Sequence, residues 1–352
     1  MTAAPHHGPR PLPLFLELLR SETAQSPEAR AEALAGLRAY QDAPRSAQRN
    51  IRPAVATAGR ATLRTIADPG TAAGPPVVFV PSLINPPDVL DLAPGNSLLG
   101  WLAEARGLNI LMVDWGSPSP AERDLGIDGH VEQLLLPLLA TLAEPPLLVG
   151  YCLGGTMALA AAQIVGARAL GLIAAPWHFA GFGGGAEDMA ALWADAEPAC
   201  DLLGLVPMEV LQTGFWRLDP ARTVQKFRRF AHLDPASEEA AAFVALEDWA
   251  NGGAPLTYAA GRQLFERFIV ADDPGRGAWT VTGQVIDPAA LPCPAIEFVS
   301  RTDRIVPAAT AINLPDRRDL AAGHVGMVVG GRARAQLWEP LADWLSQHAR
   351  PI

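Results

Sequence analysis

The chain has 352 residues, a formal net charge of −10, and 49% hydrophobic against 18% charged residues. A chain this long and apolar can bury a sizeable core, and its composition argues against extended disorder. The acidic balance and the lack of a long basic stripe argue against nucleic acid as a partner. The richest basic run, residues 226–229, fits a solvated helix face, and the single lysine, Lys226, leaves little room for Schiff-base chemistry.

The cysteines and the hydrophobic pattern predict a cytoplasmic protein. Cys152, Cys200 and Cys293 have neither metal-like nor disulfide-like spacing, which suits a reducing compartment. The first residues show no basic segment followed by an apolar core, and no run of 18 apolar residues occurs. We therefore expect no secretory signal and no transmembrane segment. We also expect no metal and no resident cofactor.

Two helical patterns come first along the chain. Phe15, Leu18 and Leu19 repeat at helical spacing, and a second pattern follows Ser26, a residue that favours the start of a helix. Residues 1–70 are therefore expected to form an N-terminal helical segment.

Short apolar runs and helical patterns then alternate. Strands are expected within residues 75–84, where Pro81 stops the apolar run, and over 109–116, 146–150 and 169–176. Helices are expected over 97–107, 128–142 and 154–166. Buried strands that alternate with helices predict an α/β fold, with a mostly parallel sheet and helices on both faces.

The alternation stops over residues 177–290, which carry helical patterns and many tryptophans but no clear strand. It returns with a strand at 293–303, a loop with a strand remnant at 316–330, and an amphipathic helix at 334–348. We predict one catalytic domain over residues 71–352, interrupted by a helical cap or lid at about 177–290.

The five residues Gly-Tyr-Cys-Leu-Gly, 150–154, lie where a predicted strand meets a predicted helix. This pattern fits a G-x-nucleophile-x-G elbow with cysteine as the nucleophile. The sharp turn needs glycines two residues before and two after the nucleophile, and the helix that follows directs its first N–H groups at the reacting carbonyl oxygen and favours a thiolate. The competing interpretation is that Cys152 is a small buried residue beside a tight turn.

Two further residues favour catalysis. A cysteine nucleophile needs a base, and the base needs a group that orients it; on this type of fold they follow in the order nucleophile, acid, histidine. Asp303 comes at the end of the predicted strand 293–303, and His324 lies 21 residues later, before the last helix. Cys152, Asp303 and His324 are the predicted triad.

The backbone N–H groups of Leu153 and Leu83 are the predicted oxyanion donors. Leu153 directly follows the nucleophile, and Leu83 lies after the first core strand. Cys200 and Cys293 have no such context and are interpreted as structural.

These motifs resemble the polyhydroxyalkanoate synthases, especially the shorter class whose catalytic subunit works with a second subunit. The sequence "GYCLGG" resembles the cysteine box of that family, "RTDRIVP" its acid loop and "GHVGMVV" its histidine loop. The segment that begins "PSLINPPDVLDL" and the element "ALEDWANGG" are similar to further family segments. The match runs from about residue 75 to the C-terminus, and it implies an α/β-hydrolase fold.

The resemblance implies a role for each triad residue. Cys152 would accept the acyl group from a 3-hydroxyacyl-CoA, and His324 would be the general base. Asp303 would either orient His324 or help to activate the 3-hydroxyl of the incoming unit. The substrates would be a CoA thioester and a polyester chain, in the cytoplasm or at polyester granules. The implied partners are a second copy of the chain, a second synthase subunit, or the granule surface.

Some positions depart from the family pattern. Pro86 and Pro87 replace a basic or aromatic pair, Trp177-His178 replaces Asp-Phe, and Arg304 replaces a histidine. His178 is interpreted either as a pocket residue or as a packing histidine. Two alternatives to a synthase therefore stay open: a cysteine-dependent hydrolase, either a thioesterase or an intracellular depolymerase, and a non-catalytic granule-associated relative.

Overall fold

The computed structural model describes residues 8–45, 52–66 and 73–349. The chain divides into two compact units. One is built from the ranges 1–50 and 207–253 and is called the helical unit here; the other, built from 51–206 and 254–352, is called the sheet unit. The predicted insertion, 177–290, contributes its middle to the helical unit and its flanks to the sheet unit. Its role as a lid stays a prediction.

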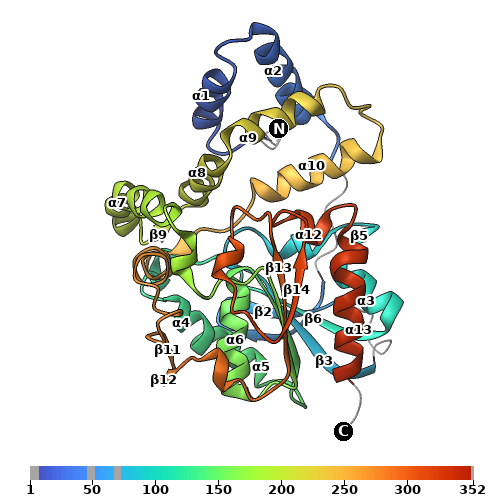
Figure 1. The fold of residues 1–352 in the computed structure, drawn as a ribbon, viewed down its shortest axis with the longest axis vertical. Helices are drawn as coiled ribbons and strands as arrows, with labels where there is room; N and C mark the ends of the chain where they lie inside the picture. Colours follow the sequence, from blue (N-terminus) through green and yellow to red (C-terminus); the bar gives the residue numbers. More distant parts are fainter. Residues whose placement is uncertain (1–7, 46–51, 67–72, 350–352) are drawn as a thin grey trace. The chain divides into compact units, whose positions relative to one another are not determined.

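The sheet unit is organised around an eight-stranded, mostly parallel sheet (Figure 1). Six neighbouring strands run parallel, and two antiparallel strands extend one edge. In spatial order the strands are β1 (Ala54–Ala58), β2 (Ala61–Thr65), β6 (Leu108–Asp114), β3 (Ala73–Val80), β7 (Leu147–Tyr151), β8 (Ala169–Ile173), β13 (Ala295–Ser300) and β14 (Asp316–Leu320). This confirms the predicted mostly parallel sheet.

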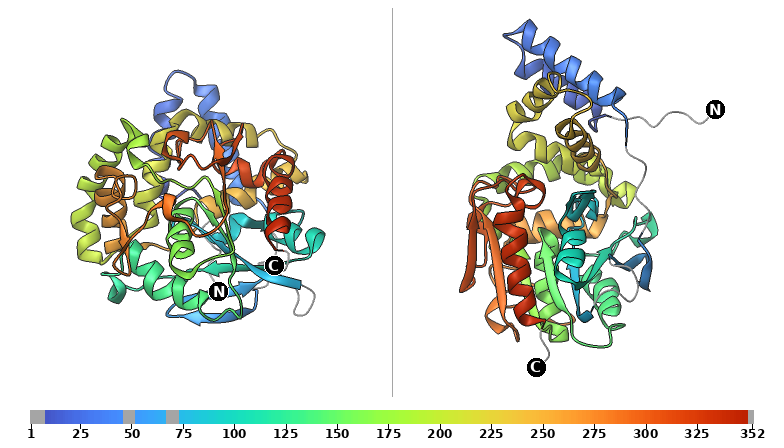
Figure 2. Two further views of the ribbon diagram at one scale, coloured as in Figure 1. Left: turned by 60° about the horizontal axis from the view of Figure 1, so that its bottom comes forward. Right: turned by 90° about the vertical axis from the view of Figure 1, so that its right-hand side faces the viewer.

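Helices cover both faces of the sheet, and Figure 2 shows these layers from two further directions. Helices α3 (Leu98–Arg106) and α13 (Glu339–His348) contact each other on one face, and α5 (Leu136–Leu139) contacts α6 (Leu153–Val165) on the other. The central strands are buried along their whole length, as expected for strands covered on both faces. The C-terminal end of β7 leads directly into α6.

The remaining elements of the sheet unit are short, apart from α7. Its helices are α4 (Ile127–His130), α7 (Gly185–Leu203), α11 (Tyr258–Arg262) and α12 (Gly326–Val329), with π-helical segments at Val131–Leu135, Gln263–Val270 and Arg334–Trp338. Single 3-10 turns cover Pro87–Leu90, Pro120–Glu122, Phe179–Phe182, Pro288–Ala290 and Ala308–Thr310. Three two-stranded ladders pair β4 (Asp91–Ala93) with β5 (Asn96–Ser97), β9 (Leu205–Val206) with β10 (Leu256–Thr257), and β11 (Thr280–Val281) with β12 (Gln284–Val285).

Three features of the sheet unit differ from the predicted elements. The first core strand is not one of them, because it ends at Val80, before Pro81, as the sequence predicts. The hairpin β1–β2 is not among the predicted elements, and β14 is a full edge strand instead of a remnant. The predicted helix 128–142 is divided by a π-helical turn that precedes Pro137. Proline has no backbone N–H, so one helical hydrogen bond is missing at Pro137, and the π-helical turn accommodates this loss.

The described residues of the helical unit form five helices from two distant parts of the chain. They are α1 (Leu12–Glu22), α2 (Pro27–Asp42), α8 (Met208–Leu218), α9 (Pro220–Phe230) and α10 (Glu238–Ala250). Phe15, Tyr40 and Phe227 are almost completely buried at its centre, and their rings meet edge to face with centroids 4.9 to 5.8 Å apart. The first helices of the chain and the segment 207–253 therefore share one hydrophobic core.

Polar contacts also connect the two parts of the helical unit. The hydroxyl of Tyr40 donates to Asp248 at 2.6 Å, and Arg45 donates two hydrogen bonds of 3.0 Å to the same carboxylate. Arg228 on α9 donates to Glu32 on α2 at 2.8 Å. The half-buried Arg45–Asp248 pair is bidentate, so it fixes orientation as well as contributing energy.

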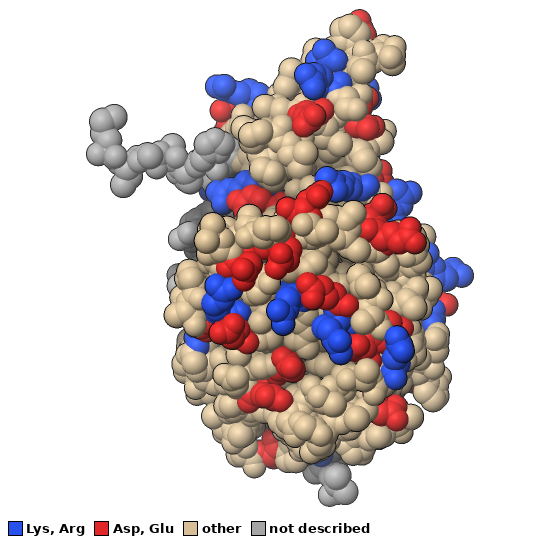
Figure 3. Space-filling model, turned by 90° about the vertical axis from the view of Figure 1, so that its left-hand side faces the viewer, with Lys and Arg blue, Asp and Glu red and all other residues tan. Residues whose placement is uncertain are grey.

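The surface carries mixed charge. On the face drawn in Figure 3, acidic and basic side chains are interspersed and form no continuous basic surface. Among the described helices, none is both long and apolar enough to cross a membrane.

Gly36 tests the packing of the helical unit. A Cβ at this position in α2 would overlap the backbone carbonyl of Phe227 in α9. We expect Gly36→Ala to destabilise the protein by about 1–3 kcal/mol, because a close helix contact must open. Thermal unfolding followed by circular dichroism measures the change.

Gly185→Ala is the matched control. Gly185 also lies in a helix, but a Cβ there meets no atom within 4 Å. We expect this variant to be as stable as the parent or slightly more so, because alanine favours helix. Equal unfolding midpoints for the two variants would contradict the close approach of α2 and α9.

Candidate active site

Cys152 occupies a strained turn between β7 and α6. Its φ of 55° and ψ of −133° lie in a region that a residue with a side chain rarely adopts, at a cost of about 1–3 kcal/mol. Two backbone hydrogen bonds hold the turn: the N–H of Cys152 donates to the carbonyl of Ile173 at 2.9 Å, and the N–H of Gly155 donates to the carbonyl of Cys152 at 2.8 Å. Cys152 is half-buried.

The glycines of the elbow are required by close contacts. A Cβ on Gly150 would overlap the backbone of residues 154–155, and one on Gly154 would overlap the carbonyls of Val80 and Pro81. A Cβ on Gly155 would overlap the side chain of Ala175. The strand, the turn and the helix can therefore pack together only if these side chains are missing, which is the physical demand expected of a nucleophile elbow.

His324 and Asp303 form a buried pair beside the elbow. The Nδ1 atom of His324 lies 2.6 Å from Oδ2 of Asp303, and the Asp303 side chain has no exposed surface. Because an ionised carboxylate only accepts hydrogen bonds, Nδ1 carries a proton, and the other ring nitrogen of His324 is left to bond the Cys152 side chain. The structure thus brings the three predicted residues together.

The charges around His324 favour its protonated form. Burial by itself lowers the pKa of an imidazole. Here the negative charges of Asp303 and Cys152, with side-chain hydrogen bonds to both, outweigh burial and raise the pKa of His324 to about 10. The arrangement is therefore suited to an imidazolium next to a sulfur nucleophile.

Asp303 uses both of its oxygens. Oδ2 faces His324, and Oδ1 accepts the backbone N–H groups of Ile305 and Val306 at 2.8 and 2.9 Å. These contacts fix the carboxylate within its own loop and leave it fully enclosed.

The loop that carries His324 is fastened to the end of β13. The hydroxyls of Ser300 and Thr302 both donate to the carbonyl of Ala322, the latter at 2.8 Å. The N–H of Arg301 donates to the carbonyl of Leu320 at 2.9 Å. The acid loop and the histidine loop are therefore held together by backbone contacts as well as by the triad itself.

Tyr151 is a site residue that the sequence did not indicate. Its ring stacks on the His324 ring, with centroids 5.1 Å apart and an interplanar angle of 27°. The sequence shows that Tyr151 precedes the cysteine. It does not show that the Tyr151 ring packs on His324, because His324 lies in a loop 173 residues away.

The predicted oxyanion donors lie on the two segments that meet at the elbow. Leu153 is the first residue of α6, where backbone N–H groups have no partner within the helix. Leu83 is in the loop after β3, whose Pro81 carbonyl lies against Gly154 and accepts the indole N–H of Trp115 at 3.0 Å. Donation by Leu153 and Leu83 to a reacting oxygen stays a prediction.

The other two cysteines lie elsewhere. Cys200 is buried in α7, and burial raises the pKa of its thiol. Burial also raises the pKa of Cys293 to about 11. Both thiols therefore stay protonated at neutral pH, and neither has a histidine among the groups that act on it. Within the residues that the structure describes, no three His, Cys, Asp or Glu side chains gather as metal ligands would.

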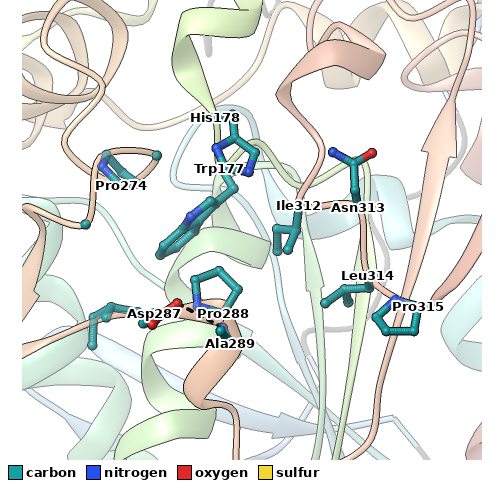
Figure 4. Close-up of a pocket in the computed structure, with 13 residues that line it drawn as sticks. Trp177, His178, Pro274, Asp287, Pro288, Ala289, Ile312, Asn313, Leu314 and Pro315 are labelled. Carbon is teal, nitrogen blue, oxygen red and sulfur yellow. Dashed lines mark hydrogen bonds between the residues drawn. The ribbon is translucent and has the colours of Figure 1, made fainter.

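His178 and Trp177 line a cavity of about 360 Å³ in the sheet unit (Figure 4). The remaining walls come from three loops, at 274–277, 286–289 and 312–315. Cys152, Asp303 and His324 do not line this cavity, so a place for His178 in the substrate pocket stays a prediction.

Comparison with known proteins indicates the relatives of the chain. No family model matches it. The poly(3-hydroxyalkanoate) polymerase subunit PhaC of Haloferax mediterranei is 28% identical over 295 residues, which cover 78% of this chain and 59% of the relative. PhaC of Allochromatium vinosum is 26% identical over 291 residues, covering 77% of this chain and 81% of the relative. The chain spans about three fifths of the length of the haloarchaeal relative. The predicted resemblance is confirmed.

The fold has counterparts among solved structures. An epoxide hydrolase from Bacillus megaterium superposes with a TM-score of 0.53 at 12% identity, and the match covers 84% of this chain and 100% of that one. At this identity the likeness shows the fold alone. It confirms the predicted α/β-hydrolase fold.

The protonation of His324 tests the geometry of the pair. Asp303→Asn removes the negative charge that acts most strongly to raise the pKa of His324. We expect the ring to lose its proton with a midpoint near 10 in the parent protein and at lower pH in the variant. NMR of ring-labelled histidine measures both, with His324→Gln to assign the signal.

The raised pKa of His324 also makes the stability of the folded chain depend on pH. Because folding raises the pKa from 6.5, the bound proton stabilises the folded chain fully below pH 6.5, and this contribution is lost as the pH rises through about 10. Asp343→Asn, a change at an exposed carboxylate on α13, is the control and should leave the His324 midpoint in place. An unchanged midpoint in Asp303→Asn would contradict the pairing.

Proposed function

We propose that this protein is a polyhydroxyalkanoate synthase-like acyltransferase that polymerises 3-hydroxyacyl-CoA through a covalent thioester on Cys152. One observation carries the proposal: a half-buried cysteine on a strained elbow lies beside a buried His324–Asp303 pair, in a chain whose curated relatives are poly(3-hydroxyalkanoate) polymerase subunits. The expected place of action is the cytoplasm or the surface of polyester granules.

The first step is acylation of Cys152. The thiolate adds to the thioester carbonyl of a 3-hydroxyacyl-CoA and forms a tetrahedral intermediate. The N–H groups of Leu153 and Leu83 are proposed to stabilise its oxyanion. The carbon–sulfur bond to CoA then breaks, and the His324 imidazolium supplies the proton that CoA thiol takes away. The nucleophile and the leaving group are both thiolates of similar basicity, so the free-energy change of the exchange is close to zero.

The second step transfers the acyl group to an alcohol. The 3-hydroxyl of the next unit attacks the thioester on Cys152 while neutral His324 accepts the hydroxyl proton. An ester bond forms, and Cys152 leaves as a thiolate that His324, now charged, stabilises. Water must be kept from the same thioester, and a lid from within residues 177–290 is the proposed means.

The contacts of Asp303 favour one of its two expected roles. Both oxygens accept hydrogen bonds within the protein and the side chain is enclosed, so a substrate hydroxyl cannot reach the carboxylate. We therefore assign Asp303 to holding the tautomer and the charge of His324. Activation of the 3-hydroxyl is assigned to His324 alone.

Cys152→Ala tests the nucleophile. We expect at least a thousandfold loss of CoA release from 3-hydroxybutyryl-CoA, because covalent catalysis ends when the sulfur is removed. Release is followed with a thiol reagent, and mass spectrometry of the product measures chain growth. In the parent protein we expect oligoesters that lengthen with time.

Cys293→Ala is the matched control, because Cys293 is also half-buried but has no histidine partner. It should retain activity. CoA release with free hydroxy acid as the only product would replace the synthase by the hydrolase alternative. Turnover in Cys152→Ala equal to that of the parent protein would exclude both enzymes that use Cys152, whereas no CoA release by the parent protein would favour the non-catalytic relative.

Asp303→Asn separates the two roles of the acid. If Asp303 acts only through His324, acylation and chain growth slow together, because both steps use the same histidine. Rapid quenching measures acyl-Cys152 in the first turnover, and product analysis measures elongation. Normal acylation followed by an arrested acyl-enzyme would show instead that Asp303 activates the hydroxyl.

A further inference from the structure

Tyr151 is the last residue of β7 and directly precedes the cysteine of the elbow. It is 4% exposed, so its position is set by packing. Its ring lies over the His324 ring in a stacked geometry, 5.1 Å between centroids and 27° between planes. Its hydroxyl lies 3.4 Å from the backbone carbonyl of His324, a long and weak hydrogen bond. The same tyrosine therefore touches both the ring and the backbone of the histidine.

We propose that Tyr151 is the positioning residue of His324: the face of its ring fixes the imidazole plane between Asp303 and Cys152 and stabilises the imidazolium form.

Two physical effects support this role. A ring packed on one face of the imidazole hinders its rotation, which keeps Nδ1 at Asp303 and the other nitrogen at Cys152. The negative face of an aromatic ring also attracts a cation within about 6 Å of its centroid, and more strongly where water is excluded. His324 becomes a cation each time it accepts a proton, so the stacked ring acts on a charged state of the reaction.

Tyr151 does not itself transfer protons. Burial, followed by the charges of Cys152 and Asp303, raises the pKa of its hydroxyl well above the ordinary value. The hydroxyl therefore stays protonated and serves as a donor. The groups that set the charge of His324 are Asp303, from the loop after β13, and Cys152, from the elbow. The ring of Tyr151 adds to these two without a charge of its own.

The inference rests on the proposed function only in using the same site. Its test needs no acyl substrate, because alkylation of Cys152 by iodoacetamide reports the share of thiolate directly. Rates are measured from pH 5 to 10, and peptide mass spectrometry separates Cys152 from Cys200 and Cys293.

Tyr151→Leu removes the ring. We expect alkylation of Cys152 at pH 7 to slow by about tenfold, because the imidazole is no longer held beside the sulfur and the thiolate loses the imidazolium that stabilises it. The deficit should disappear towards pH 10, where a thiolate forms without the imidazolium. A defect of packing alone would not follow this pH dependence.

Two further sets of variants keep the test decisive. Tyr151→Phe retains the ring and should restore most of the alkylation rate at pH 7. Phenylalanines with one to five ring fluorines at position 151 keep the ring in place while weakening its negative face, so the pH at which His324 loses its proton, about 10 in the parent protein, should fall stepwise. This series decides the question even if Tyr151→Leu does not fold.

Tyr258→Leu is the control for loss of a buried tyrosine in the sheet unit. Tyr258 bonds Glu197 and packs beside Trp193, and none of its ring contacts is with the triad. In this variant, Cys152 should be alkylated at the same rate as in the parent protein. An unchanged rate at pH 7 in Tyr151→Leu, or a flat fluorine series, would overturn the proposal. The expected alkylation profile without turnover of any hydroxyacyl-CoA would leave it standing and reject the synthase.

Discussion

The hydrogen bond between His324 and Asp303 is the contact on which the arrangement of the site depends. A fully enclosed carboxylate is costly unless its charge is paired and its oxygens are bonded. Here one oxygen of Asp303 accepts a hydrogen bond from the imidazole, and the other accepts hydrogen bonds from two backbone N–H groups of its own loop. The loops after β13 and β14 are therefore stable only in the form that places the histidine at the acid, and the position of the ring beside Cys152 follows from this.

Parallel strands explain why residues so distant in sequence can meet. The strands β7, β8, β13 and β14 run in the same direction, so their C-terminal ends share one edge of the sheet. Cys152, Asp303 and His324 each follow one of these ends. The elbow adds the remaining element, because the glycines around Cys152 let the helix, the strand and the loop after β3 approach within van der Waals distance. The fold thus supplies proximity, and the triad hydrogen bonds supply orientation.

The parts of this arrangement that the sequence predicts are those with a local pattern. Gly150, Cys152 and Gly154 are adjacent in sequence and are constrained by one turn, and the core strands are continuous apolar runs. Edge elements lack that pattern: β14 reads Asp-Arg-Arg-Asp-Leu, since an edge strand exposes most of its side chains, and β1 is mostly exposed. The stacking of Tyr151 on His324 depends on which loop covers a strand end, and no residue spacing encodes that. The same limit applies to the helical unit, where Phe15 and Phe227 share a core although more than 200 residues separate them.

The small ladder between β9 and β10 has a consequence for how the chain can vary. Val206 pairs with Leu256 across this ladder, so the segment 207–253 leaves the sheet unit and returns to it at neighbouring positions. An excursion whose ends are already joined adds little closure entropy when it lengthens or shortens. The sheet and its elbow can therefore keep their register while the excursion gains, loses or exchanges helices. In evolutionary terms, the ladder lets the segment 207–253 change while the edge of the sheet that carries Cys152 keeps its structure.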